Sequence, residues 1–157
     1  MKKIAFLDRD GVINVDYGYV YLRENFHFMD GLEELMKWLI SSNFEIIIVT
    51  NQSGIGRGIY SEKQYLELTF WYKKYLASNG ISILDIFYCP YYKHSKNSKY
   101  SIDSNCRKPK PGLFLKAAKE NNINLSESIA IGDKHTDLIA AKGAGIKKRY
   151  LIKNNNN

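Results

Sequence analysis

Two aspartates near the start of the chain are spaced for chemistry at phosphorus. Asp8 and Asp10 are separated by one residue in the segment Asp8-Arg9-Asp10-Gly11. An extended backbone points side chains two residues apart to the same side, so both carboxylates can face one reactant. Such a pair allows one carboxylate to attack as a nucleophile while the other handles the proton of the leaving group.

A carboxylate that approaches a phosphate dianion is repelled, so this chemistry needs positive charge and hydrogen-bond donors. Asp8 and Asp133 offer oxygen ligands for Mg²⁺, which binds proteins through one or two carboxylates together with phosphate. Lys108 can add a fixed positive charge, and the Thr50 hydroxyl can donate to a phosphate oxygen. Glycines are expected to let backbone N–H groups approach the anion closely at four positions: Gly11, Gly54, Gly56 and Gly58.

Each of these residues also has an ordinary structural interpretation. An aspartate after a strand is commonly a turn or helix-cap residue, Thr50 can cap a loop, and Lys108 can be a solvated lysine. The combination favours the chemical interpretation, because four such segments follow one another in a single α/β pattern. We therefore expect them to converge on one site.

Short apolar runs alternate with helical patterns along the whole chain. Strands are expected at Ile4–Leu7 and at residues 46–49, 84–89, 128–131 and 148–152. Helices are expected at residues 31–42, at 61–78 after a capping box of Ser61 and Gln64, at 111–121 with Pro111 first, and at 136–142.

This alternation predicts an α/β fold, an open, doubly wound, mainly parallel sheet with helices on both faces. Residues 1–153 are expected to form a single domain, and the Asn-rich residues 154–157 a disordered tail. In such sheets ligands bind outside the carboxyl ends of the strands. Asp8, Thr50 and Asp133 all follow predicted strands, so the rule brings them to the same edge.

The composition is that of a soluble globular protein, with 45% hydrophobic and 25% charged residues in a chain of 157. No apolar run approaches the roughly 20 residues of a membrane span. The apolar segment after Lys2-Lys3 stops at Asp8, too early for an export signal. We therefore expect a cytoplasmic protein without a membrane partner.

The net charge of +7, from 23 basic and 16 acidic residues, is compatible with nucleic acid or with a polyanionic substrate. The basic residues are scattered and form no arginine-rich block, which favours an ordinary solvated surface. A nucleic-acid partner is therefore not expected, and we expect a monomer.

Four motifs resemble those of a known family. The segment Asp8-Arg9-Asp10-Gly11-Val12-Ile13-Asn14 and residues 50–58, 107–112 and 132–137 are similar, in this order, to motifs of the haloacid dehalogenase superfamily of phosphatases. The similarity is to the branch of D,D-heptose 1,7-bisphosphate phosphatases and histidinol-phosphatases. It implies a Rossmann-like core, with no sizeable cap domain inserted in this chain.

The resemblance also implies a role for each matching residue. Asp8 would be the nucleophile that forms an aspartyl-phosphate, and Asp10 the general acid and then the general base. Mg²⁺ would be held by the side chains of Asp8 and Asp133 and by the backbone carbonyl of Asp10. Thr50 and Lys108 would steady the phosphoryl group. Contacts to the rest of the substrate are expected from Arg9, Asp16, Tyr17, Gly18, Tyr19, Asn51, Gln52, Ser53, Arg107 and Lys134.

The branch acts on small phosphorylated molecules. The first expectation is the 7-phosphate of D-glycero-D-manno-heptose 1,7-bisphosphate, and histidinol phosphate is the nearest alternative. Arg107 favours a second anionic group on the substrate, because guanidinium binds phosphate bidentately.

Two other classes of function share some of these features. A receiver-like domain that only accepts phosphate also combines acidic residues with a threonine and a lysine. Asp10 argues against it, since an acid/base residue beside the nucleophile suits turnover. A phosphatase acting on nucleic-acid ends is a further alternative, for which salt-sensitive binding to oligonucleotides would be evidence.

The branch usually carries a zinc loop, Cys-x-His and then Cys-x-Cys just before Arg107. Here Tyr91 stands in place of the histidine, and only Cys106 remains of the second pair. Cys89 and Cys106, with His94 as a third candidate, fall short of the four ligands of a structural zinc site, so zinc is not expected. The loop would keep its shape by packing or by pairing the two cysteines, although a cytoplasmic setting favours reduced thiols.

Overall fold

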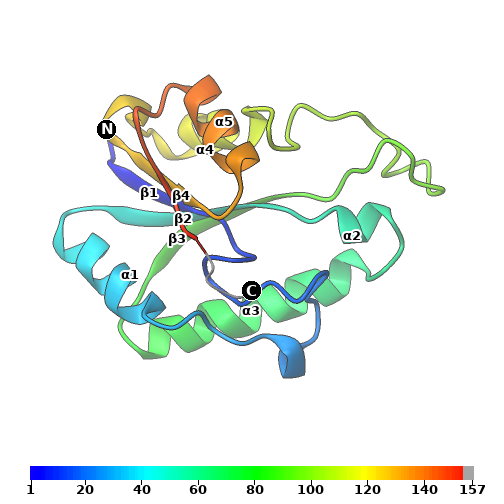
Figure 1. The fold of residues 1–157 in the computed structure, drawn as a ribbon, viewed down its shortest axis with the longest axis horizontal. Helices are drawn as coiled ribbons and strands as arrows, with labels where there is room; N and C mark the ends of the chain where they lie inside the picture. The colour runs from blue at the N-terminus through cyan, green and yellow to red at the C-terminus, as the bar shows by residue number, and fades with distance from the viewer. Residues whose placement is uncertain (154–157) are drawn as a thin grey trace.

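A five-stranded parallel sheet forms the centre of the molecule (Figure 1). The computed structural model describes residues 1–153. The strands are β1 (Ile4–Leu7), β2 (Glu45–Asn51), β3 (Ile83–Cys89), β4 (Ile129–Gly132) and β5 (Lys148–Leu151), in the order β3-β2-β1-β4-β5. All neighbouring strands run parallel, as predicted. The Asn tail predicted at 154–157 lies outside the described residues.

Helices cover both faces of the sheet, so the predicted fold class is confirmed (Figure 1). One face carries α1 (Leu32–Ser41) and α3 (Glu62–Ser78), and the other carries α4 (Gly112–Asn121) and α5 (His135–Ala144). The capping box predicted for α3 is present, with Gln64 N–H donating to the Ser61 hydroxyl at 3.1 Å. Pro111 is the N-cap of α4 rather than its first residue. None of the helices in residues 1–153 has the length and apolar character needed to cross a bilayer.

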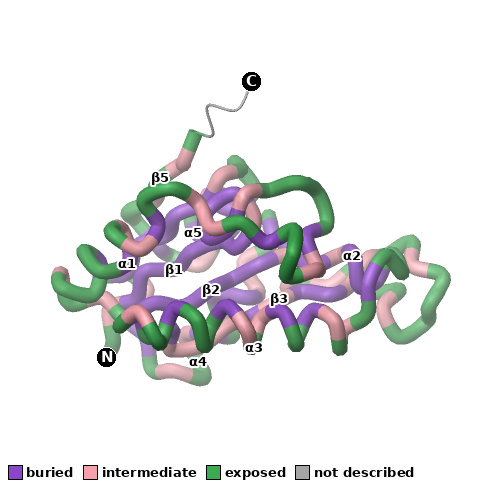
Figure 2. Tube along the Cα trace, turned by 90° about the horizontal axis from the view of Figure 1, so that it is seen from below, coloured by how far each residue is buried: buried purple, intermediate pink, exposed green. Residues whose placement is uncertain are grey.

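The alternation of side chains along the strands divides the core in two. Leu7 of β1 belongs to the cluster under α1 and α3, together with Met36 and Tyr72. Its neighbour Phe6 belongs to the opposite cluster, where it meets the Phe114 ring of α4 edge-on at 5.1 Å. The central strands are therefore buried on both faces (Figure 2), which is why they consist almost entirely of apolar residues.

Three short helical turns have no counterpart among the predicted elements: α2 (Ser53–Gly56) and the 3-10 helices η1 (Arg23–Asn25) and η2 (Leu125–Glu127). Elements this short contain too few positions to show a hydrophobic period. Of the three, α2 bears directly on the site because it follows the carboxyl end of β2.

The long loop between β3 and α4 is fastened to the rest of the protein at several points. The Tyr100 hydroxyl donates to the Glu62 carboxylate at 2.8 Å, which ties the loop to the start of α3. The hydroxyl of Tyr88 in β3 donates to the same carboxylate at 2.6 Å. A disulfide between Cys89 and Cys106 joins the two ends of the loop. The disulfide therefore holds in place the start of the segment that follows Cys106.

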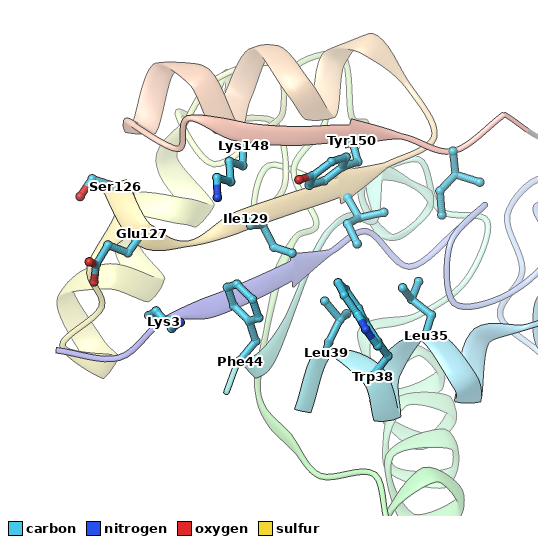
Figure 3. Close-up of a pocket in the computed structure, with 12 residues that line it drawn as sticks. Lys3, Leu35, Trp38, Leu39, Phe44, Ser126, Glu127, Ile129, Lys148 and Tyr150 are labelled. Atoms are coloured by element: carbon cyan, nitrogen blue, oxygen red, sulfur yellow. The ribbon is translucent and has the colours of Figure 1, made fainter. Parts of the chain in front are cut away.

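A groove of about 700 Å³ lies between α1 and the strands β4 and β5 (Figure 3). Trp38 and Leu35 of α1 face Ile129 and Tyr150 across it. Among the described residues its lining has no member in common with that of the cavity at the strand ends. The groove is therefore separate from the site described next.

Candidate active site

The carboxyl ends of the strands border a cavity of about 430 Å³ that collects most of the predicted site residues. Those that line it are Asp10, Asp16, Gly18, Tyr19, Asn51, Gln52, Ser53, Arg107, Lys108 and Lys134. Asp8 and Thr50 are buried directly behind this lining, in hydrogen-bond contact with Lys108 and Gln52 respectively. The segments expected to converge at this edge of the sheet therefore do so.

Three carboxylates meet next to the cavity. Asp8 comes from the end of β1, and Asp133 and Asp137 come from the turn after β4 and the start of α5. One oxygen of each lies within 4.8 Å of the others. Oδ1 of Asp133 is buried and has no hydrogen-bond partner among the described residues. A buried oxygen without a donor, inside a cluster of carboxylates, fits a hard cation such as Mg²⁺.

The electrostatics of this cluster also fit a cation. Burial raises the pKa of Asp8 to about 7; the charge of Lys108 opposes the rise and that of Asp137 adds to it. Burial and the Asp137 charge raise the pKa of Asp133 as well. Carboxylates crowded together in this way resist ionisation, and a divalent cation relieves that repulsion.

Lys108 is held at the centre of the site. Its Nζ atom lies 3.0 Å from Asp8 Oδ1, 2.6 Å from Asp137 Oδ1 and 2.9 Å from the Val49 carbonyl. Burial alone would lower the pKa of Lys108, but the charges of Asp8 and Asp137 outweigh it and raise the pKa. The side chain is therefore a fixed positive charge, as the sequence predicted, and not a solvated lysine.

The Asn51 side chain fixes the backbone of Lys108. Its Nδ2 donates to the Lys108 carbonyl at 3.1 Å, and its Oδ1 accepts the Lys108 N–H at 3.0 Å. Asn51 was expected to contact substrate; it lines the cavity, but its amide is engaged in joining the end of β2 to the Lys108 loop.

Asp10 is surrounded by donors. Its Oδ1 accepts from Arg9 Nη2 at 2.8 Å, from Arg9 Nε at 3.3 Å and from Asn14 Nδ2 at 3.1 Å, and its Oδ2 accepts from Gln52 Nε2 at 3.2 Å. The carboxyl is thus held in one orientation at the edge of the cavity.

Two residues expected to contact substrate do not line the cavity within the described chain. Arg9 is 1% exposed, and its guanidinium donates to the Val20 carbonyl at 2.6 Å and lies over the Phe26 ring. Its alternation with Asp8 and Asp10 turns it into the core. Tyr17 is exposed, and its hydroxyl pairs with His27 Nδ1 at 3.1 Å.

The glycines serve packing more than anion binding. The N–H groups of Gly11, Gly56 and Gly58 already donate to the carbonyls of Asn14, Pro90 and Ile55. A Cβ atom at Gly54 would overlap the Tyr60 ring, and one at Gly11 the Asp133 carboxylate. Gly11 also has a φ of +86°, which favours glycine. The expected approach of these backbone groups to the anion is therefore wrong at Gly11, Gly56 and Gly58.

Arg107 and Lys134 supply positive charge to the lining of the cavity. The Nη1 atom of Arg107 is buried and has no hydrogen-bond partner in the described part of the chain. Lys134 Nζ lies 3.7 Å from Asp16 Oδ2. Because Arg107 lines the cavity, its guanidinium offers a positive charge to an anionic group of a ligand.

Asp137 and Tyr60 are absent from the predicted set of site residues. Asp137 pairs with Lys108 and also accepts the Lys134 N–H at 3.1 Å, which caps α5. Its position four residues after Asp133, at the start of the helix predicted at 136–142, was a usable signal. Tyr60 lines the cavity and donates its hydroxyl hydrogen to Gln52 Oε1. No local pattern marks it, because the contact depends on the path of α2.

Cys89 and Cys106 form a disulfide, with their Cα atoms 5.6 Å apart. Of the two arrangements expected for a loop without zinc, the structure has the paired cysteines. Bonded sulfurs do not act as two thiolate ligands. His94 packs edge-on against the Tyr92 ring. The expectation that the cysteines stay reduced differs from this structure, because the end of β3 and the turn before Arg107 meet at bonding distance.

These features agree with comparisons to known proteins. The family model of the haloacid dehalogenase-like hydrolases matches residues 4–145. The chain belongs to this family. The D-glycero-beta-D-manno-heptose-1,7-bisphosphate 7-phosphatase of Pasteurella multocida is 47% identical over 153 residues, 98% of this chain and 83% of that protein. The D-glycero-alpha-D-manno-heptose-1,7-bisphosphate 7-phosphatase of Photorhabdus laumondii is 46% identical, over 96% of this chain and 82% of that protein.

A solved structure is similar in fold as well as sequence. D,D-heptose 1,7-bisphosphate phosphatase from B. bronchiseptica, complexed with magnesium and phosphate, is 31% identical with a TM-score of 0.82, over 96% of this chain and 80% of that chain. The predicted family and phosphatase activity are thus confirmed for this haloacid dehalogenase-like hydrolase, and phosphatases of the family use Mg²⁺. Membership of a hydrolase family contradicts the receiver-like alternative.

Proposed function

We propose that this chain removes the 7-phosphate of D-glycero-D-manno-heptose 1,7-bisphosphate in a Mg²⁺-dependent reaction. The observation that carries the proposal is a buried Asp8 held 3.0 Å from Lys108, with Asp10 on the wall of the adjoining cavity. The names of the relatives support the substrate. The proposal includes both anomers of the sugar, since the relatives include enzymes named for each.

The first half of the proposed reaction transfers the phosphoryl group to the protein. An oxygen of Asp8 attacks phosphorus, the bond from phosphorus to the sugar oxygen breaks, and Asp10 gives its proton to that oxygen. The Lys108 ammonium stabilises the charge that develops on the phosphoryl oxygens.

The second half releases phosphate. The Asp10 carboxylate takes a proton from a water molecule as the water oxygen attacks phosphorus, and the bond between phosphorus and Asp8 breaks. Inorganic phosphate leaves, Asp8 is again a carboxylate, and Asp10 is again protonated. The fixed orientation of Asp10 suits both proton transfers, because the sugar oxygen and the water occupy the same side of phosphorus in turn.

Mg²⁺ would be held by the side chains of Asp8 and Asp133 and by the backbone carbonyl of Asp10. The unpartnered Oδ1 of Asp133 supports this assignment. When bound, the ion supplies positive charge to the phosphoryl oxygens and so reduces their repulsion of Asp8.

Arg107 supports a bisphosphate as substrate. Its unpartnered Nη1 can bind the phosphate that does not react. Histidinol phosphate carries a cationic amine where the sugar carries this second phosphate, so Arg107 disfavours it. We also propose that the protein acts as a monomer in the cytoplasm on this soluble substrate, without a nucleic-acid partner.

Phosphate release from D-glycero-D-manno-heptose 1,7-bisphosphate tests the proposal. Histidinol phosphate and a 5′-phosphorylated oligonucleotide are measured alongside, each with Mg²⁺ and with a chelator. Release from the heptose compound, lost on chelation and much slower with the other two, is the expected result. Faster release from either competitor would replace the proposed substrate.

A further inference from the structure

The Gln52 side chain is the centre of a buried hydrogen-bond network. Its Nε2 donates one hydrogen to Asp10 Oδ2 at 3.2 Å and the other to Thr50 Oγ1 at 2.9 Å. Its Oε1 accepts the hydroxyl hydrogen of Tyr60. Gln52 is 2% exposed, so water does not replace these partners readily. The Tyr60 hydroxyl donates to the amide oxygen, which leaves the two hydrogens of Nε2 for Asp10 and Thr50 and so sets the orientation of the amide.

This network distinguishes the two oxygens of Asp10. Oδ1 receives three hydrogen bonds, from Arg9 and Asn14, and has no room for a proton. Oδ2 receives only the bond from Gln52 and keeps a free lone pair. The oxygen that exchanges a proton with a ligand is therefore Oδ2, and Gln52 fixes its direction.

The same amide sets the direction of the Thr50 hydroxyl. Because Gln52 donates to Thr50 Oγ1, the hydroxyl hydrogen must point elsewhere. It makes a long bond of 3.3 Å to the Asn51 carbonyl, which a phosphoryl oxygen can replace. One side chain thus orients both the acid and a donor for the phosphoryl group.

Tyr60 holds the Gln52 amide in this orientation through the hydrogen bond from its hydroxyl. Its ring is stacked on Tyr21 at 5.1 Å with 13° between the planes, and it fills the space left by Gly54. Burial raises the pKa of Tyr60, so its hydroxyl stays a donor. Without that hydroxyl the Gln52 amide can turn over. Its oxygen would then accept the proton of Asp10 Oδ2 and withdraw it from the leaving group.

We propose that Tyr60 and Gln52 are positioning residues that direct the Asp10 proton to the leaving group. This inference rests on the proposed roles of Asp8 and Asp10. It makes a prediction that a general packing role does not share. Loss of the Tyr60 hydroxyl should slow the expulsion of a basic leaving group, which needs the proton, much more than that of an acidic one.

The test compares Tyr60→Phe with the matched control Tyr21→Phe, which removes a hydroxyl from the other ring of the stack. Phenyl phosphate and p-nitrophenyl phosphate are the substrates, and kcat/KM is measured because it reports only the steps up to departure of the leaving group. For Tyr60→Phe we expect a loss of about tenfold with phenyl phosphate and of less than about twofold with p-nitrophenyl phosphate. Tyr21→Phe should match the wild type with both.

A double variant tests whether Tyr60 acts through Gln52. Gln52→Met should show the same selectivity for the leaving group, and adding Tyr60→Phe to it should cause no further loss. Equal losses for both substrates, or additive effects in the double variant, would overturn the inference. Aryl phosphates separate this outcome from that of the proposed function: turnover of these compounds without release from the heptose bisphosphate refutes the substrate alone.

Discussion

The Lys108 ammonium and the Asp137 carboxylate form a buried ion pair, with Nζ 2.6 Å from Oδ1. The second oxygen of Asp137 accepts the backbone N–H of Lys134 at 3.1 Å. One carboxylate therefore joins the loop before α4 to the start of α5. It also balances the charge of Lys108, so Asp8 is not the sole counter-charge of this lysine.

Asp137→Asn should weaken both the fold and the reaction. The amide keeps an acceptor but loses the charge, and Lys108 retains Asp8 and the Val49 carbonyl. We therefore expect a loss of about 2 kcal/mol in the free energy of unfolding, below the cost of removing a buried partner completely. Urea denaturation measures it, and the Mg²⁺-dependent rate should fall at least about tenfold. Asp103→Asn, which breaks the exposed pair with Lys110, is the control and should change neither.

Asp8→Asn should abolish turnover without weakening the metal-free fold. Because burial raises the pKa of Asp8 to about 7, its charged form opposes folding at higher pH. The neutral amide removes that effect, so at pH 8 the metal-free variant should be at least as stable as the wild type.

Mg²⁺ should reverse the order of stability of the wild type and the Asp8→Asn variant. It stabilises the wild type by binding the folded state and should stabilise the variant, which lacks one carboxylate, much less. Thermal midpoints with Mg²⁺ and with a chelator provide the measurement. An equal rise in both proteins would remove Asp8 from the metal site.

Much of the fold follows from local physical rules. The strands were predicted within one or two residues at each end because β1 and β2 are buried on both faces and therefore apolar throughout. The start of α3 was predicted because a capping box is a local hydrogen-bond motif. By contrast, α2 has only four residues. It depends on close packing of Gly54 against Tyr60 and of Gly56 against Pro90, and no local sequence pattern predicts these contacts.

The site was predictable where it depends on strand ends. In a parallel sheet, ligands bind outside the carboxyl ends of the strands, and this rule follows from sheet topology alone. It therefore places Asp8, Thr50 and Asp133 together. The assignment of Arg9 to substrate failed for a reason available in the sequence, since a residue between two aspartates that face the site must point the other way, into the core. Tyr60 was not predictable, because its contact with Gln52 arises only once α2 has turned the chain back.

Arg107→Ala should show which of the two phosphates of the proposed substrate Arg107 binds. If its unpartnered Nη1 binds the phosphate that does not react, KM for the heptose bisphosphate should rise by about 10- to 100-fold, the value of one or two charged hydrogen bonds. The KM for p-nitrophenyl phosphate, which has a single phosphate, should change little. Steady-state kinetics on both compounds decides, and a similar rise with each would place Arg107 at the reacting phosphate instead.

Removal of the disulfide should loosen the loop that carries Lys108. The bond joins residues 17 apart in sequence, a loop for which chain entropy predicts a stabilisation of about 3 kcal/mol. Guanidinium denaturation of the double variant Cys89→Ser/Cys106→Ser should show a loss near that value. A dithiol reductant should shift the wild type toward the variant and leave the variant unchanged. Equal stability of wild type and variant under oxidising conditions would contradict a closed disulfide.

Glu62 gives the loop a dependence on pH that can be measured without activity. Hydrogen bonds from Tyr88 and Tyr100 and the charge of Lys99 lower the pKa of Glu62 below its ordinary 4.5. An acid whose pKa is lower in the folded state stabilises the fold above its unfolded pKa and loses that contribution as the pH falls.

At pH 7, Glu62→Gln should therefore be less stable than the wild type by about 1 kcal/mol, a modest value because the side chain is partly exposed. Denaturation at a series of pH values should show this difference shrinking as the pH falls below the ordinary pKa of 4.5, because Glu62 takes up a proton in the wild type. Glu67→Gln, in an exposed pair with Lys63 on the same helix, is the control and should show no such trend. A difference that stays constant with pH would mean that Glu62 holds the loop by its shape and not by its charge.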